Sequence, residues 1–294
     1  MSVTVRPPST SPSSTAPITV PDIRAARARG TRLAMLTAYD FPTARLLDAA
    51  GIDILLVGDS VGNNVLGYAS TLPVTMEEML HHVKAVARGT RRALVVADMP
   101  YLSYQTGRRD ALRNAGRFLK EAGAAAVKIE GGRRRAALVR AMVEAEIPVM
   151  GHIGLLPQSV HVMGGYKVQG KRMDEARALV EDAQALEEAG AFSIVLEGMP
   201  EPVGRRVTQA VGIPTLGIGA GRFCDGQVLV FHDVVGLSPG PGPRFVRRYA
   251  DLAGVISDAA RRFIDDVRSG AFPSEAETYA MPAPVEGAQD GTRR

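Results

Sequence analysis

The sequence predicts a single (β/α)₈ barrel, in which eight parallel strands alternate with helices and close into a ring. Short β-branched apolar runs alternate along the chain with longer helical patterns, which is the order of elements in repeated βαβ units. The apolar runs are nearly uninterrupted, as expected for parallel strands that are covered on both faces. About 250 residues separate two polar ends of the chain, a typical length for this fold.

Eight candidate strands can be placed on these apolar runs. A doubly wound open sheet is the alternative, because the periodicity of apolar residues does not show whether a sheet closes. The strands are expected at Leu33–Thr37, Asp53–Val57, Ala93–Asp98, Ala125–Glu130, Ile147–His152, Phe192–Glu197, Thr215–Gly219 and Val228–Asp233.

Residues that begin and end helices support this division. Thr75 with Glu78 has the pattern of a capping box at the start of a helix. Asp110 is a candidate N-cap for a later helix, and Gly123 is placed to end that helix. Gly51 likewise suits the left-handed residue that ends the helix before the second strand.

Composition excludes several classes of protein. Apolar residues make up 46% of the chain and charged residues 22%, which is typical of a globular protein with a real core. No apolar run approaches the roughly 20 residues of a membrane span. The net charge is +4, and the basic residues are scattered among acids, so nucleic acid is not an expected partner. The single Cys224 excludes an internal disulfide and fits a reducing compartment, so we expect a cytoplasmic protein.

Both ends of the chain are expected to lie outside the barrel. Residues 1–20 are rich in Ser, Thr and Pro and contain no acid, so they predict a disordered tail. Residues 282–294 resemble a second polar tail. The barrel domain is therefore expected to span residues 21–281.

Four acidic residues directly follow or end predicted strands: Asp59, Asp98, Glu130 and Glu197. Any one of them has a structural interpretation, since an Asp at a strand end often caps the next helix. Four of them, each after an apolar run, instead indicate a site at the carboxyl ends of the strands, where barrels carry their chemistry.

The order of these acids indicates a division of roles. Asp59, Asp98 and Glu130 follow the second, third and fourth strands, which are neighbours in a barrel. Three converging carboxylates repel one another unless a cation or protons neutralise them, and hard oxygen ligands suit Mg²⁺. Glu197 follows the sixth strand, away from this arc, and is free to act as a base.

Lys128 interrupts a buried apolar run and points to the same face of its strand as Glu130, two residues later. The structural interpretation is an ion pair with Glu130, because a buried lysine is costly unless it is paired. The functional interpretation, which we favour, is that Lys128 binds a substrate carboxylate beside the metal.

At these same segments the sequence resembles the ketopantoate hydroxymethyltransferase family. The matching stretches run through the whole predicted barrel in order: MLTAYD (35–40), VGDSVG (57–62), LGYASTLPVTMEEM (66–79), VVADMPYLSY (95–104), KIEGG (128–132), PVMGHIGLLPQSV (148–160), GGYKVQG (164–170), VLEGMP (195–200) and GIGAGRFCDGQVLVFHD (217–233).

The resemblance implies a barrel enzyme that binds Mg²⁺ and transfers a hydroxymethyl group from 5,10-methylenetetrahydrofolate to 3-methyl-2-oxobutanoate. The product would be 2-dehydropantoate, formed by way of an enolate that Mg²⁺ stabilises as a Lewis acid. The partners implied are a small 2-oxo acid and a folate, with neither nucleic acid nor membrane, and the assembly implied is a ring-like homodecamer.

The resemblance also assigns roles to individual residues. Asp59 and Asp98 would contact both metal and substrate, and Glu130 would reach the metal directly or through water. Ser60 and Lys128 would bind the substrate. Glu197 would be the proton acceptor.

This chain departs from the family in two places. GRFCDG replaces the more usual GNxTDG after the seventh strand, which puts folate affinity there in doubt. Asn63 and Asn64 replace more apolar residues but leave Ser60 intact.

Three other functions are compatible with the sequence. Lys128 could form a Schiff base in a metal-free aldolase, provided that desolvation lowers its pKa. The chain could instead be a Mg²⁺-dependent lyase or mutase of the phosphoenolpyruvate-related barrels, acting without folate. It could also be a non-catalytic binding protein, because fold does not fix function.

Overall fold

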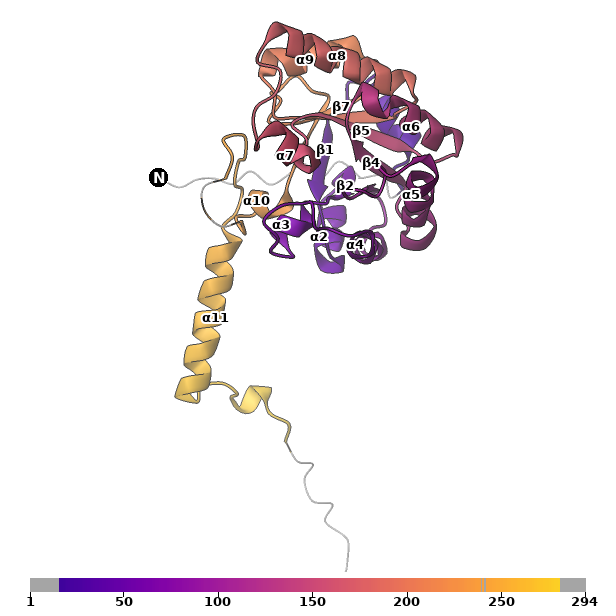
Figure 1. Ribbon diagram of the computed structural model, residues 1–294. Helices are drawn as coiled ribbons and strands as arrows, with labels where there is room; N and C mark the ends of the chain where they lie inside the picture. The colour runs from indigo at the N-terminus through magenta and orange to yellow at the C-terminus, as the bar shows by residue number, and fades with distance from the viewer. Residues whose placement is uncertain (1–15, 239, 241, 281–294) are drawn as a thin grey trace, which may run out of the picture.

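The structure is a computed structural model that describes residues 16–238, 240 and 242–280. Its centre is a closed barrel of eight parallel strands in sequential order (Figure 1). The strands are β1 Leu33–Thr37, β2 Ile54–Val57, β3 Leu94–Asp98, β4 Ala126–Glu130, β5 Val149–Gly154, β6 Ser193–Glu197, β7 Thr215–Ile218 and β8 Gly226–Leu229.

Closure is the feature that the apolar pattern left open. The first strand pairs in parallel with the last, with Leu33 opposite Gly226 and Leu36 opposite Leu229. A doubly wound open sheet is thereby excluded, and the predicted (β/α)₈ barrel is confirmed.

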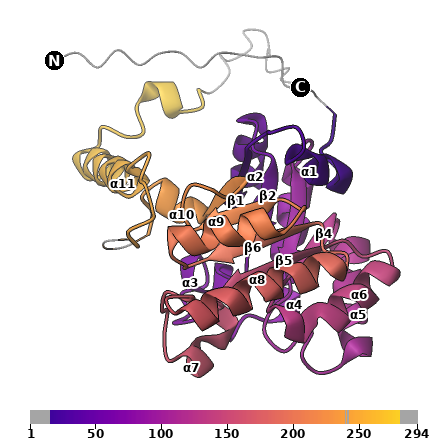
Figure 2. The ribbon, with the colours of Figure 1, turned by 90° about the horizontal axis from the view of Figure 1, so that it is seen from above.

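Helices surround the strands and connect them in turn (Figure 2). The longer ones are α2 Phe41–Ala49, α4 Met76–Gly89, α5 Arg108–Ala122, α6 Arg133–Glu144, α8 Met173–Glu188 and α9 Glu201–Ala210. Short helices follow several strands at the rim of the barrel where the strands end. They are α3 Val61–Asn64, the 3-10 turn Pro157–Ser159, α7 Val160–Met163 and α10 Phe231–Val234.

Two apolar cores hold these layers together. One lies between the strands and the surrounding helices, where Val83, Phe118 and Leu186 are buried. The other fills the barrel itself. Helix α1, Val20–Ala26, adds Ile23 and Ala26 to the interior core, so it covers the end of the barrel where the strands begin.

The ends of the barrel domain differ from the sequence prediction. Ile18 N–H donates to the Arg92 carbonyl at 2.7 Å, and Thr19 forms a capping box with Asp22 at the start of α1. The predicted disordered tail therefore ends before residue 20, and its first fifteen residues lie outside the described part of the chain. The predicted tail at 282–294 also lies outside it.

At the other end, α11, Leu252–Ser269, projects away from the barrel in both views (Figures 1 and 2). None of its residues is buried, and Val255, Phe263 and Ile264 are exposed. The last part of the predicted 21–281 domain thus extends beyond the packed barrel. Within the described residues, no helix has the length and apolar character needed to cross a membrane.

Most of the residues predicted to begin or end helices do so in the structure. The capping box of Thr75 and Glu78 is present, and Gly51 and Gly123 adopt the left-handed backbone with φ of +91° and +79°. The prediction for Asp110 was wrong. Helix α5 already begins at Arg108, so Asp110 lies inside the first turn and its carboxylate accepts from Thr106 Oγ1 instead.

The prediction for the eighth strand was displaced. We expected Val228–Asp233, but β8 runs from Gly226 to Leu229 and Phe231 already begins α10. The Phe231 N–H donates to Thr37 Oγ1 at 3.0 Å, a contact that turns the chain out of the sheet. An apolar run alone could not show where that turn occurs.

Candidate active site

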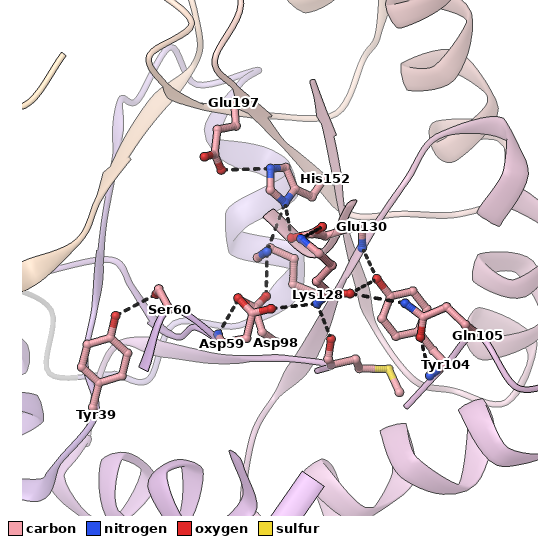
Figure 3. A network of polar contacts seen from close by, with 12 residues as sticks. Tyr39, Asp59, Ser60, Asp98, Tyr104, Gln105, Lys128, Glu130, His152 and Glu197 are labelled. Carbon is pink, nitrogen blue, oxygen red and sulfur yellow. Dashed lines mark hydrogen bonds and ion pairs between the residues drawn. The ribbon is translucent and has the colours of Figure 1, made fainter. Parts of the chain in front are cut away.

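All six residues predicted for the site line one cavity at the carboxyl ends of the strands, namely Asp59, Ser60, Asp98, Lys128, Glu130 and Glu197. The cavity has a volume of about 110 Å³. Its polar residues form a connected set of hydrogen bonds and ion pairs (Figure 3). The topology thus brings together side chains that are up to 138 positions apart in the sequence (197 minus 59).

Lys128 and Asp98 form the buried ion pair at the centre of the site. Their Cα atoms are partners in the β3–β4 register, and Lys128 Nζ lies 2.7 Å from Asp98 Oδ1. The side chains are only 6% and 5% exposed. Asp98, on the neighbouring strand, is therefore the ion-pair partner of Lys128, in place of the Glu130 that the structural interpretation named.

The charge state of Lys128 bears on the Schiff-base alternative. Burial disfavours the ammonium, but the carboxylates of Asp98, Glu130 and Asp59 outweigh burial and raise the pKa of Lys128 above its ordinary value. A Schiff-base lysine needs a lowered pKa, so this environment works against that chemistry.

Asp59 lies beside Asp98 at the start of the turn into α3. The Asp59 N–H donates to Asp98 Oδ2 at 3.1 Å. Burial, followed by repulsion from Asp98 and Glu130, raises the pKa of the Asp59 carboxyl to about 8. Burial likewise raises the pKa of Asp98. Two buried carboxylates in this position are destabilised as anions unless a cation balances them.

Glu130 is held on the other side of the ion pair by a loop. Gln158, in the 3-10 turn after β5, donates its backbone N–H to Glu130 Oε2 at 3.1 Å. The Glu130 backbone N–H in turn donates to Tyr104 Oη at 3.2 Å. Glu130 is therefore fixed in place before any ligand arrives.

Glu197 lies across the cavity from the Asp59–Asp98 pair, and His152 stands between them (Figure 3). His152 Nε2 is 3.1 Å from Glu197 Oε2, while Nδ1 is 3.6 Å from Glu130 Oε1 and 3.3 Å from Lys128 Nζ. The Glu197 side chain is 20% exposed, whereas that of Glu130 is 4% exposed. Glu197 is therefore the more accessible of the two glutamates.

Opposing effects set the protonation of His152. Burial and the charge of Lys128 lower its pKa, but the pairing of His152 with the carboxylates of Glu130 and Glu197 outweighs them and raises it to about 9. The raised pKa favours a protonated His152 that pairs with both glutamates.

Ser60 is oriented from outside the cavity. Its Oγ lies 2.8 Å from Tyr39 Oη. A Cβ on Gly58 would come within 2.7 Å of Ser60 Oγ and 3.4 Å of Asp98 Oδ2, so the glycine permits this close packing. Asn64 donates to the Ser60 carbonyl at 2.8 Å, so this departure from the family pattern supports the turn that carries Ser60.

The departures after β7 lie away from the cavity. Arg222 pairs with Glu201 on α9, and Phe223 lies beneath the guanidinium groups of Arg205 and Arg222. Cys224 is buried against the strands. None of Arg222, Phe223 and Cys224 is among the residues that line the cavity.

The carboxylates of this cavity suit a divalent cation only if water and substrate oxygens complete its coordination. Within the described residues, no group of three or more His, Cys, Asp or Glu is gathered closely enough to hold a metal ion. Mg²⁺ does not require such a cage, because one or two carboxylates with water and substrate oxygens satisfy it. Asp59 and Asp98 supply two such carboxylates in the cavity, and the metal roles of Asp59, Asp98 and Glu130 stay predictions.

The sequence alone led to no catalytic, metal-binding or substrate-binding role for Tyr39, Tyr104, His152 or Gln158. A signal existed for two of them. His152 and Gln158 are polar residues in the otherwise apolar stretch PVMGHIGLLPQSV. The two tyrosines carried no pattern of their own, because their partners Ser60, Glu130 and Gln158 lie on or after other strands.

Comparisons with known proteins agree with this architecture. Two solved structures share the fold, each with a TM-score of 0.57. A 2,3-dimethylmalate lyase is 19% identical and covers 88% of this chain and 91% of its own. A phosphonopyruvate hydrolase, solved with oxalate and Mg²⁺, is 15% identical and covers 89% and 92%.

Sequence relatives are much closer. Proteins named 3-methyl-2-oxobutanoate hydroxymethyltransferase match from Trichlorobacter lovleyi, with 56% identity over 90% of this chain and 98% of the relative, and from Koribacter versatilis, with 58% identity over 84% of each. A third, from Nitratidesulfovibrio vulgaris, is 54% identical over 96% of this chain and 92% of the relative. The sequence model of the ketopantoate hydroxymethyltransferase family matches residues 17–275. The chain therefore belongs to the ketopantoate hydroxymethyltransferase family.

Proposed function

We propose that this protein transfers a hydroxymethyl group from 5,10-methylenetetrahydrofolate to 3-methyl-2-oxobutanoate, forming 2-dehydropantoate for pantothenate synthesis. The names of its relatives support the acceptor and the group transferred. The observation that carries the proposal is the division of the cavity, with Asp59, Asp98 and Lys128 on one side and Glu197, beside His152, on the other.

The size of the cavity supports a small substrate. Sites for drug-sized ligands usually measure about 300–1,000 Å³, whereas this cavity measures about 110 Å³. A cavity of this size supports a small branched acid in preference to a folate as its occupant. The folate would therefore deliver its one-carbon unit from the mouth of the barrel.

Asp59 and Asp98 would hold Mg²⁺, with Glu130 nearby and open positions left for water and substrate. When bound, Mg²⁺ supplies Lewis-acid stabilisation of negative charge on the 2-oxo group. Lys128 attracts the substrate carboxylate, and Ser60, held by Tyr39, offers a hydroxyl to the same substrate. These contacts would direct C3 of the substrate toward the far side of the cavity.

Glu197 would remove the proton from C3. Its carboxylate is the more accessible of the two glutamates, and His152 Nε2 at 3.1 Å orients it. The electron pair left on C3 forms the new bond to the one-carbon unit. Across the whole reaction, one water supplies the hydroxyl oxygen and tetrahydrofolate leaves.

A transfer assay on the full chain tests this proposal. The 2-oxo acid and 5,10-methylenetetrahydrofolate are incubated with Mg²⁺, and the hydroxymethylated product is followed by mass spectrometry. We expect product only when acid, folate and metal are all present, and almost none with Asp59→Asn.

Two results would overturn it. Cleavage or rearrangement of 2-oxo acids without folate would favour the lyase or mutase alternative. Full activity in EDTA, with borohydride trapping on Lys128, would favour the Schiff-base alternative.

A further inference from the structure

Gln158 is a buried polar residue that the chemistry above does not use. It lies in the turn after β5, directly behind the apolar sequence Leu155–Pro157, and is only 7% exposed. From there its side chain reaches the loops that follow β2 and β3.

Every hydrogen-bonding position of the Gln158 amide is occupied. Nε2 donates to Asp59 Oδ2 at 2.8 Å and to the Met99 carbonyl at 2.9 Å. Oε1 accepts from Tyr104 Oη at 2.6 Å and from Gln105 Nε2 at 3.3 Å. An amide has two N–H donors and one carbonyl acceptor, so this site satisfies it completely.

The direction of these bonds is determined by their partners. Tyr104 Oη accepts the backbone N–H of Glu130, so its own proton is free to go to Gln158 Oε1. The Met99 carbonyl can only accept, and it meets Nε2. The amide is therefore held with its donors toward Asp59, and a flipped amide would set Oε1 against two acceptors.

We propose that Gln158, oriented by Tyr104, is a positioning residue that fixes the Asp59 carboxylate for cation binding. One oxygen of Asp59 is engaged by the amide, and among the described residues the structure gives no hydrogen bond to Oδ1. A ligand carboxylate held in this way has one oxygen committed and one available. The inference rests on the metal role proposed for Asp59.

The test measures cation binding directly, with Mn²⁺ as the probe and free Mn²⁺ followed by electron paramagnetic resonance. The full chain is compared with Gln158→Met, which keeps the side-chain length but removes both donors. Loss of an outer hydrogen bond to a metal ligand typically weakens affinity about 10–100-fold, and we expect that range. Tyr104→Phe should weaken binding in the same direction, and Tyr101→Phe, on an exposed tyrosine, should not.

Activity supplies a second readout. For Gln158→Met, the Mg²⁺ concentration giving half-maximal activity should rise by the same factor, while the rate at saturating Mg²⁺ returns close to that of the parent. Because bound metal also stabilises a folded chain, the circular dichroism of metal-free Gln158→Met should match that of the parent, which separates weaker metal binding from damage to the fold.

The outcomes separate the two proposals. If Asp59→Asn binds Mn²⁺ as tightly as the parent chain, the metal role of Asp59 is wrong. If Asp59→Asn loses binding but Gln158→Met and Tyr104→Phe bind within twofold of the parent, the metal role stands and the positioning role of Gln158 is wrong. Should Gln158→Met fail to fold, Tyr104→Phe decides.

Discussion

Replacing Lys128 with methionine should destabilise the protein by about 3–5 kcal/mol, the usual cost of removing one partner of a buried ion pair. Methionine is also long and unbranched, so the change removes the charge and leaves little cavity. Lys128 Nζ is 2.7 Å from Asp98 Oδ1, and both side chains are at least 94% shielded from solvent. Asp98 would stay buried among the same neighbours but would lose the positive charge of Lys128 that pairs with it.

The corresponding loss in melting temperature follows from the size of the barrel. A domain of about 150–250 residues loses roughly 2–4 °C per kcal/mol, so Lys128→Met should melt about 6–20 °C lower. Circular dichroism at matched protein concentration and without added metal measures it. The deficit should shrink as the pH is lowered, because protonation of Asp98 removes the unpaired charge.

Arg172→Met is the matched control. Arg172 Nε lies 3.1 Å from Asp174 Oδ1, but these side chains are 73% and 68% exposed. Exposed pairs contribute about 0–1 kcal/mol, so this variant should melt within a few degrees of the parent. If Lys128→Met were no less stable than Arg172→Met, the description of the site as a desolvated cluster of charges would be wrong.

Three further predictions concern stability. Burial raises the pKa of Asp59 from 3.8 to about 8, so between these pH values the folded metal-free protein holds a proton that the unfolded chain releases. The free energy of unfolding should therefore fall as the pH rises from about 4 to 8. In urea titrations, Asp59→Asn should flatten that fall. Gly154→Ala should cost several kcal/mol, since φ is +99° and the new Cβ would lie 2.1 Å from the Glu197 carbonyl. Gly116→Ala, with open space around it, should be neutral or stabilising in the same melts. Thr75→Ala should cost about 1 kcal/mol through loss of the α4 cap, measured by urea unfolding.

The positions of the strands and of the acids could be predicted because both are local properties. An apolar run followed by an acid places that acid at the carboxyl end of a strand, and Asp98, Glu130 and Glu197 each form the last residue of theirs. Parallel strands then bring such ends to one rim of the barrel. This is why residues far apart in sequence could be assigned to one cavity.

The partners of each side chain could not be predicted in the same way. Lys128 and Glu130 share a face of β4, but the register across β3 and β4 decides that Lys128 meets Asp98. Tyr104 and Gln158 meet only because the loops after β3 and β5 converge. Contacts of this kind depend on register and loop path, which leave no periodic trace in the sequence.

The end of the barrel shows a similar limit. Helix α11 has clear local ends, since Asp251 caps it and Gly270 ends it with φ of +74°. Its amphipathic sequence could not show that the helix projects from the barrel, because an apolar stripe indicates burial without naming the surface that buries it.

Exchange of the C3 hydrogen of 3-methyl-2-oxobutanoate in D₂O, followed by proton NMR without folate, tests the central claim most directly. The parent chain with Mg²⁺ should exchange this hydrogen, and EDTA should stop the exchange. Glu197→Gln should lose exchange while still binding Mn²⁺, whereas Glu201→Gln, outside the cavity, should retain it. Undiminished exchange in Glu197→Gln would contradict the assignment of Glu197 as the base, and undiminished exchange in EDTA would contradict the metal.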